Sequence, residues 1–362
     1  MAATTYADFN ATTEGLDVAK TFSDKVHGNT ILITGVNIAG IGFSTAQAFA
    51  SQSPAHLIIT GRSLSKIEES VHSLRIQFPG LDCRGLQIDL SSQQSVRQAA
   101  NRLMGWTDIP SIDIVINNAG IMCIEERTLS CDGIELHFAT NHIGHWLFTC
   151  LIMPKLIKSA KAHSEGTTRI VNVTSASPTV SGMRWSDMNF DVKNKDLPKE
   201  EQPVGAWFEA WGYTDLDNQS YNPLDGYNRS KVANVLSGIG LNQRLFEKYG
   251  IFSLSVHPGV IGTTELGRNF PSDLIEAVQA MAGKGLFDFK TAGAGAATSV
   301  VAALDPALAK GVGDSKNGCI NWGSYLVDCQ ISDQASPLAV SSDQAEKLWE
   351  LSEKLVGQSF SW

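Results

Sequence analysis

The amino-acid sequence predicts an α/β protein built on a doubly wound parallel sheet. Short apolar runs, typical of strands buried on both faces, alternate with longer segments that repeat apolar residues at three- and four-residue steps. A glycine-rich turn joins the first such run to the first helical segment. The chain has 362 residues, of which 43% are hydrophobic, and this is enough to bury one large core or two modest ones.

The expected strands and helices follow one another in alternation. Strands are expected at 30–34, 57–60, 84–88, 112–117, 169–174 and 252–256, and 84–88 has the weakest pattern. Helices are expected at 43–52, 64–78, 92–104, 133–156 and 231–249. We expect one domain over 29–362 after an N-terminal arm over 1–28. Because such sheets bind ligands at the carboxyl ends of their strands, the residues just after each strand are the functional candidates.

The composition excludes several classes of protein. A formal net charge of −9 disfavours nucleic acid and anionic membranes as partners. No apolar run approaches the roughly 18 residues that cross a bilayer, and the first thirty residues lack a signal-peptide pattern. We therefore expect a cytoplasmic protein. The cysteines form no C-x-x-C pair and lie near no histidine cluster, which predicts reduced thiols and no metal site: Cys83, Cys123, Cys131, Cys150, Cys319 and Cys329.

The turn at 34–42 is the first candidate site. Its glycines permit a tight turn and let the backbone approach a pyrophosphate, and the following helix offers free N–H groups and the positive end of its dipole. Its position between a strand and a helix favours dinucleotide binding over a purely structural turn. The residues expected to contact the cofactor here are Gly35, Asn37, Gly40, Ile41 and Gly42.

The end of the second strand indicates which dinucleotide is bound. An acid that would hold the ribose 2′-hydroxyl of NAD is absent there, and Arg62 offers a planar cation suited to the 2′-phosphate of NADP. A solvated surface arginine is the alternative. After the third strand, Asp89 and Leu90 are expected near the adenine, although Asp89 is nearly as well suited to cap the next helix.

Two further turns are expected to line the cofactor. After the fourth strand, Asn118, Ala119 and Gly120 form a wall of small residues beside the ribose, unless they make only a simple turn. After the sixth strand, Pro258 and Gly259 form a rigid turn, and Thr263 supplies a hydroxyl for the nicotinamide carboxamide.

Tyr227 and Lys231 form the central catalytic candidate. Their four-residue spacing places the phenol and the ammonium on one helical face. A cation about 5 Å away at an effective dielectric near 20 contributes on the order of 3 kcal/mol, which would lower the phenol pKa by roughly two units. Tyr227 would then exchange protons near neutral pH. A surface pair of this kind also arises by chance.

Two polar residues complete the candidate set. Ser175 follows the fifth strand and would donate to a substrate carbonyl oxygen as that oxygen gains charge, whereas strand-end hydroxyls are otherwise ordinary caps. Asn141 lies in an apolar helix, where a buried amide needs partners. It would hold a water that relays protons toward Lys231, and a satisfied structural role is nearly as well supported.

In this order, the residues resemble the short-chain dehydrogenase/reductase family. The resemblance is strongest to retinol-dehydrogenase-like and WW-domain-oxidoreductase-like members, including fungal enzymes of secondary metabolism, and covers about residues 26–330. It implies a Rossmann fold that binds NADP(H) and a tetrad in which Lys231 also holds the nicotinamide ribose: Asn141, Ser175, Tyr227 and Lys231.

The chain departs from the family pattern in three respects. The phosphate turn is one residue longer, with Ala39 where related longer turns have Gly, which predicts a locally reshaped cradle that still binds the cofactor. We expect no membrane anchor of the kind that many retinol dehydrogenases have, which weakens the inference of a retinoid substrate. The segment 176–226 is longer than usual and rich in aromatic residues. A substrate lid, a packed subdomain and a homo-oligomer contact all remain open for this insert.

These features predict NADPH-dependent reduction of an apolar ketone or aldehyde, or the reverse oxidation of an alcohol, with Tyr227 moving the proton. The expected partner is a small-molecule substrate. The alternatives are a regulatory protein that binds NADP(H) without catalysis, and a non-redox dehydration or cyclisation in the same pocket.

Overall fold

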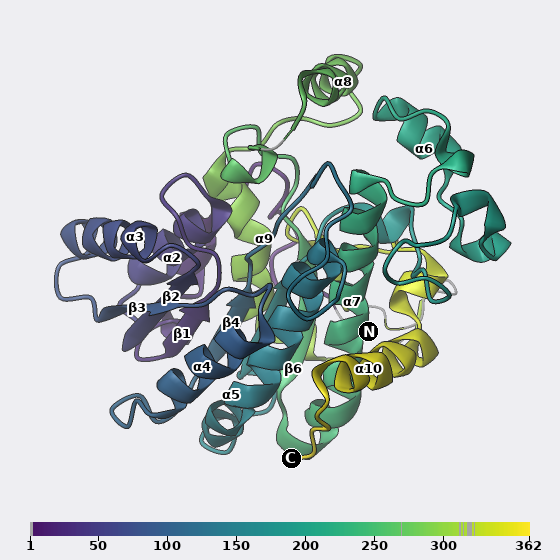
Figure 1. Ribbon diagram of the computed structural model, residues 1–362. Coiled ribbons are helices and arrows are strands. Elements are labelled where there is room, and N and C mark those ends of the chain that lie inside the picture. The colour runs from purple at the N-terminus through teal and green to yellow at the C-terminus, as the bar shows by residue number, and fades with distance from the viewer. Residues whose placement is uncertain (1–2, 269, 311–312, 314, 317–320, 322) are drawn as a thin grey trace.

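The computed structural model describes residues 3–268, 270–310, 313, 315–316, 321 and 323–362. Its centre is an eight-stranded sheet in the order β3-β2-β1-β4-β5-β6-β7-β8 (Figure 1). All neighbouring strands are parallel except β7 and β8, which are antiparallel. The winding direction reverses between β1 and β4, so the predicted doubly wound sheet is confirmed. The strands are β1 (Thr30–Ile33), β2 (His56–Gly61), β3 (Cys83–Gln87), β4 (Ile114–Asn117), β5 (Arg169–Val173), β6 (Phe252–His257), β7 (Tyr325–Val327) and β8 (Gln330–Ile331).

Helices cover both faces of the sheet because successive strand residues point to opposite sides. Ile31 and Ile33 belong to a core packed under α1 (Gly15–Thr21), α2 (Ile41–Ala50), α3 (Leu64–Gln77) and α9 (Ala292–Leu304). Leu32, between them, belongs to a second core under α4 (Gln93–Met104), α5 (Gly144–Ala160), α7 (Pro223–Tyr249) and α10 (Ser342–Val356). α6 (Gly205–Ala210) and α8 (Ser272–Gly283) project from the body at the top of Figure 1.

Two helices differ from the sequence prediction. The helix expected at 133–156 begins later, with a π-helical turn at Phe138–Ile143 followed by α5, because the Glu135 carboxylate accepts the N–H groups of His137 and Phe138. The helix expected at 231–249 begins earlier, at Pro223, where the side chain of Asn222 accepts the N–H of Leu224 at 2.9 Å.

The N-terminal arm packs against the domain. Val18 and Ala19 of α1 are fully buried, and α1 contacts α2 and α9. Thr291 Oγ1, at the start of α9, donates to Glu14 Oε1 at 2.6 Å. The described cysteines are free thiols, and Cys319 lies outside the described residues. None of the described helices is both long and apolar enough to span a membrane, and the described residues hold no cluster of metal-ligating side chains.

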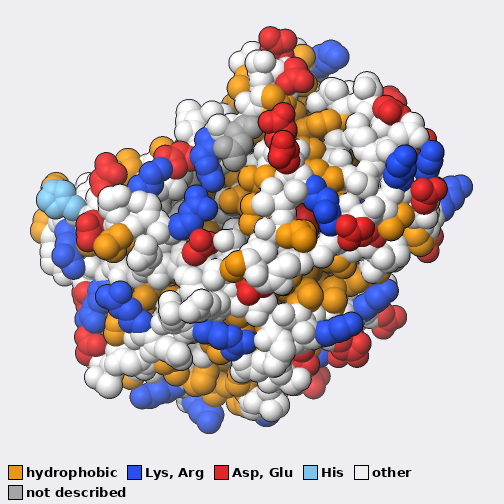
Figure 2. Space-filling model, viewed as in Figure 1, with side chains coloured by type: hydrophobic (Ala, Val, Ile, Leu, Met, Phe, Trp, Pro, Cys, Tyr) orange, Lys and Arg blue, Asp and Glu red, His pale blue; other side chains and the backbone are white. Residues whose placement is uncertain are grey.

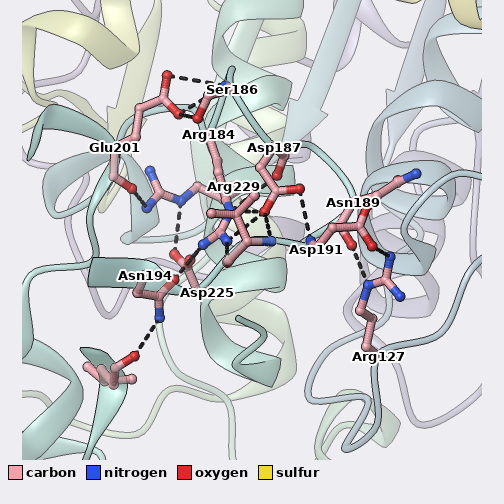
Figure 3. Close-up of polar contacts among 12 residues, drawn as sticks. Arg127, Arg184, Ser186, Asp187, Asn189, Asp191, Asn194, Glu201, Asp225 and Arg229 are labelled. Atoms are coloured by element: carbon pink, nitrogen blue, oxygen red, sulfur yellow. Dashed lines mark hydrogen bonds and ion pairs between the residues drawn. The ribbon is translucent and has the colours of Figure 1, made fainter. Parts of the chain in front are cut away.

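A buried ionic cluster fixes the first part of the 176–226 insert to α7 (Figure 3). Arg184, fully buried, pairs with Asp187 at 2.8 Å, and its Nη1 lies 3.8 Å from Asp225 Oδ2 at the start of α7. Arg229, one turn further along α7, pairs with Asp225 at 2.9 Å and donates to the Glu201 carbonyl at 2.7 Å. Asp225 and Arg229, which lie two residues before and two residues after Tyr227 in α7, are therefore both fixed by this cluster.

Candidate active site

A cavity of about 1240 Å³ lies at the carboxyl ends of the strands. Its walls are residues that follow β1 to β6, together with side chains of α6, α7 and α8. Apolar side chains gather around the hollow below and between α8 and α6 (Figure 2). The cavity has a polar, glycine-lined arm near β1 and β2 and an apolar arm under α6 and α8, so it offers room for a dinucleotide and a second, apolar molecule.

The glycine-rich turn has the geometry of a phosphate cradle. Gly35 has φ of +69°, and a Cβ there would lie 2.5 Å from Ala119 Cα. A Cβ on Gly42 would lie 2.6 Å from Asn118 Nδ2. No side chain caps the start of α2 at Gly40, which leaves its first N–H groups facing the cavity. These features fit a bound dinucleotide, and all the residues expected in this turn line the cavity: Gly35, Asn37, Gly40, Ile41 and Gly42.

The predicted nucleotide-binding residues after β2 and β3 also line the cavity. Arg62 is exposed and has no acidic partner within the described part of the chain. Asp89 Oδ1 accepts from the N–H of Ser91 at 3.0 Å and from its hydroxyl at 2.7 Å. Asp89 therefore holds the local turn and lines the cavity next to Leu90, while the cap of α4 is Ser92, whose side chain accepts from the Ser95 N–H. The capping role expected for Asp89 is wrong, and its contact with the adenine stays a prediction.

The wall after β4 is tied to the first turn by a threonine that the sequence analysis missed. Thr34 Oγ1 accepts from the backbone N–H groups of Asn118 and Ala119 at 2.9 and 3.0 Å. His145 Nε2 lies 2.8 Å from the same Oγ1, and its Nδ1 lies 3.0 Å from the Asn141 carbonyl oxygen. Burial lowers the pKa of His145 to about 4, so the imidazole is neutral and serves as a hydrogen-bonding link.

The turn after β6 corrects one predicted residue. Pro258 and Gly259 line the cavity, as expected. Thr263 is exposed and lies outside the cavity lining, whereas Thr264 is part of it. The chain turns between Ile261 and Thr264, so the threonine that lines the cavity comes one residue later than predicted.

Tyr227, Lys231 and Gly120 meet at the junction of the two arms. Lys231 Nζ lies 5.6 Å from the centroid of the Tyr227 ring and donates to the Val173 carbonyl at 2.9 Å. A Cβ on Gly120 would lie 3.4 Å from Lys231 Nζ and 3.5 Å from Asn141 Oδ1, so glycine lets the wall approach both polar groups. The two catalytic candidates predicted from their four-residue spacing are therefore neighbours.

The pKa shifts of this pair correct the electrostatic prediction. Burial raises the pKa of Tyr227 above its ordinary value, and a hydrogen bond with Ser175 opposes this rise only in part. Burial also lowers the pKa of Lys231 to about 7. The expected lowering of the phenol pKa by Lys231 is therefore wrong for the protein alone, because both groups lose solvation and the amine keeps only part of its charge at neutral pH.

Ser175 faces Tyr227 and is held by a second serine. The Ser177 N–H donates to Ser175 Oγ at 3.0 Å, and the two hydroxyl oxygens are 2.6 Å apart. Ser177 Oγ in turn donates to Asn228 Oδ1 at 2.7 Å. A hydroxyl has one proton, so Ser175 is the donor between the two serines. Tyr325 donates to the Ser175 carbonyl at 2.8 Å, which fixes the main chain.

Asn141 takes the structural role that the sequence left open. Its Oδ1 accepts from the Ile121 N–H at 2.9 Å, and its Nδ2 donates to the Ile121 carbonyl at 3.0 Å and to Ser230 Oγ at 2.9 Å. The amide thus fastens the loop after β4 to α7, and its role in holding a water that relays protons toward Lys231 stays a prediction. The π-helical turn places it there, a feature often seen at functional sites.

The apolar arm of the cavity was only partly foreseen. The second part of the insert supplies Trp207 and Trp211, and the segment after β6 supplies the other wall. Leu274 of α8 and Phe208 of α6 share one apolar cluster with Tyr227, so both helices pack near this tyrosine. The lining residues that the sequence did not single out include Lys66, Met122, Ser177, Asn228, Glu265, Phe270, Met281 and Phe287.

Comparisons with known proteins identify the family. The family model described as short chain dehydrogenase matches residues 29–187. Oxidoreductase fscI of Fusarium equiseti is 36% identical, with 69% of this chain and 94% of the relative covered. Short-chain dehydrogenase TIC 32 B, chloroplastic, of Brassica napus is 35% identical, with 94% of each chain covered. Human retinol dehydrogenase 14 is 32% identical, with 92% of this chain and 87% of the relative covered.

A solved structure shares the fold. An uncharacterised protein from Mycobacterium paratuberculosis superposes with a TM-score of 0.62 at 24% identity, covering 93% of this chain and 96% of that one. With relatives above 30% identity over more than nine-tenths of its length, this chain belongs to the short-chain dehydrogenase family of oxidoreductases.

Proposed function

We propose that the protein transfers hydride between NADP(H) and an apolar ketone, aldehyde or alcohol. The observation that carries this proposal is the meeting of Tyr227, Ser175 and Lys231 where the glycine-lined arm joins the apolar arm. Bound NADPH supplies the hydride in reduction, and NADP+ accepts it in oxidation. The chain's own residues then have to bind the substrate oxygen, move a proton to or from it, and exclude water.

Tyr227 is the proposed proton donor in reduction. The carbonyl carbon gains a hydride, its oxygen gains the phenolic proton, and the reverse transfer accompanies oxidation. Ser175 turns its hydroxyl from Ser177 toward the substrate oxygen and stabilises the charge that develops there. Lys231 is anchored on the Val173 carbonyl and lies 5.6 Å from the centroid of the Tyr227 ring. It would hold the nicotinamide ribose hydroxyls and would serve as the source of the proton that restores Tyr227.

The preference for NADP(H) rests on Arg62. Its guanidinium stands exposed at the cavity without an acidic partner in the described part of the chain, and the turn after β2 contains no acid that would bind a free 2′-hydroxyl. The Arg62→Ala variant should weaken NADPH binding far more than NADH binding. Equal losses for both would contradict the preference.

The substrate class rests on the apolar arm. Trp207, Trp211 and Phe270 line it, and large aromatic surfaces favour apolar ligands. The name of retinol dehydrogenase 14 points to an apolar alcohol as the substrate of that relative, which agrees with this choice.

We place the activity in the cytoplasm, and cell fractionation would test this.

The test is a turnover assay with NADPH and a panel of apolar ketones and aldehydes, followed by the absorbance of the reduced cofactor. Wild type should oxidise NADPH with at least one carbonyl, and the Tyr227→Phe variant should lose turnover by at least about a hundredfold while binding NADPH nearly as well. Unchanged turnover in this variant would refute the role of Tyr227. Silence of wild type across the panel would favour a regulatory or non-redox role.

A further inference from the structure

An ion pair bridges the two rims of the nucleotide arm. Lys66 Nζ lies 2.7 Å from both carboxylate oxygens of Glu265, although the residues are 199 positions apart in the sequence. Lys66 is in the first turn of α3, just after Arg62 and Ser63, and Glu265 follows β6 at the start of the segment that leads to α8. Both side chains line the cavity. The pair therefore joins the rim near the proposed 2′-phosphate position to the rim beside the substrate arm.

The pair is well placed to exchange partners. The side chains of Lys66 and Glu265 remain 50% and 40% exposed, and ion pairs exposed to this degree contribute little stability. A phosphate monoester carries close to two negative charges and three acceptor oxygens, so it is a stronger partner for an ammonium than one exposed carboxylate. The Ser63 side chain caps α3 by accepting the Lys66 N–H, so Lys66 stands in the helical turn that directly follows Arg62, and both residues line the cavity.

We propose that Lys66 is a second ligand of the 2′-phosphate, and that Glu265 competes with this phosphate for Lys66. This inference rests on the proposed use of NADP(H). The two positive charges of Arg62 and Lys66 together match the charge of the phosphate. Glu265 weakens the binding of the phosphate to Lys66, because the carboxylate has to release the ammonium first. NADH, which carries a 2′-hydroxyl at the same place, leaves the ion pair intact. The two residues therefore tune cofactor selectivity without touching the reacting atoms.

The experiment is a fluorescence titration of NADPH and of NADH with wild type and three variants: Lys66→Gln, Glu265→Gln and the double variant. Removing the competing carboxylate in Glu265→Gln should tighten NADPH binding about two- to fivefold and leave NADH binding unchanged. Lys66→Gln should weaken NADPH binding about tenfold and also leave NADH binding unchanged. In the double variant the gain from Glu265→Gln should vanish, because no ammonium remains to be released.

A matched control is the exposed pair of Arg244 and Glu346, whose closest atoms are 2.7 Å apart and whose Glu346 side chain is 48% exposed. Glu346→Gln should change the affinity for neither nucleotide, since the pair does not line the cavity. The inference is overturned if Glu265→Gln fails to tighten NADPH binding, if it tightens both nucleotides equally, or if its effect persists without Lys66. If wild type itself binds both nucleotides equally, the proposed NADP(H) preference fails first and this inference fails with it.

Discussion

Lys231 Nζ lies 5.6 Å from the centre of the Tyr227 ring, in a site where both side chains are buried. This contact brings the proposed proton donor next to an amine whose pKa burial lowers to about 7. The amine therefore changes its charge within the neutral range and not near its ordinary value of 10.5. Its protonation state is consequently sensitive to any charge that binds beside it.

The first prediction concerns stability against pH. Below about pH 7, Lys231 is protonated in both the folded and unfolded states, and between pH 7 and about 10 only the unfolded state keeps the proton. The free energy of unfolding should therefore rise with pH in this window, by at most about 1.4 kcal/mol per unit from this group. Urea unfolding of wild type and Lys231→Met at pH 6 to 9 measures the difference. Parallel curves for the two proteins would contradict the lowered pKa.

The second prediction concerns the serine that supports Ser175. Ser177→Ala removes the acceptor of the Ser175 proton and the link to Asn228, so Ser175 loses its fixed orientation. We expect kcat to fall about tenfold, equivalent to about 1.4 kcal/mol, with the Kd for NADPH unchanged. Ser177→Thr keeps the hydroxyl and should retain most of the activity. Steady-state kinetics that give wild-type kcat for the alanine variant would exclude this positioning role.

The third prediction concerns the ionic cluster of the insert. Arg184→Met leaves the Asp187 and Asp225 carboxylates buried without this guanidinium. We expect the free energy of unfolding to drop by about 3–5 kcal/mol, because an uncompensated buried charge is costly. Lys195→Met, which alters an exposed lysine of the same insert, should cost less than about 0.5 kcal/mol. A loss below about 1 kcal/mol in Arg184→Met would show that the cluster does not anchor the insert.

The fourth prediction concerns the phosphate turn. A Cβ on Gly42 would lie 2.6 Å from Asn118 Nδ2 and 2.8 Å from the Gly35 carbonyl oxygen, so Gly42→Ala forces the turn and its wall apart. We expect NADPH binding to weaken by about tenfold or more, which a fluorescence titration measures. Gly205→Ala, at the start of α6, meets no atom within 4 Å and should bind NADPH as wild type does. Wild-type affinity in Gly42→Ala would show that the turn is not the cradle.

Sequence patterns located the elements whose signals are local. The apolar runs placed β1, β2, β4, β5 and β6 within two residues of their ends, because strands buried on both faces need continuous apolar residues. The weaker run at 84–88 located the partly exposed strand β3 as closely. The glycines of the first turn and the spacing of Tyr227 and Lys231 are likewise properties of short segments. The capping signal at Asn222 and Pro223 was also present in the sequence, and reading it would have placed the start of α7 correctly.

The amino-acid sequence alone determined the class of fold, the order of the landmarks and the residue types available for chemistry, because these depend on neighbours along the chain. Only the tertiary structure decided that Thr264 and not Thr263 lines the cavity, that Ser177 supports Ser175, and that Lys66 meets Glu265. It also reversed the expected pKa shift of Tyr227. Burial and contacts between distant segments depend on how all the elements pack together, and no local pattern contains that information.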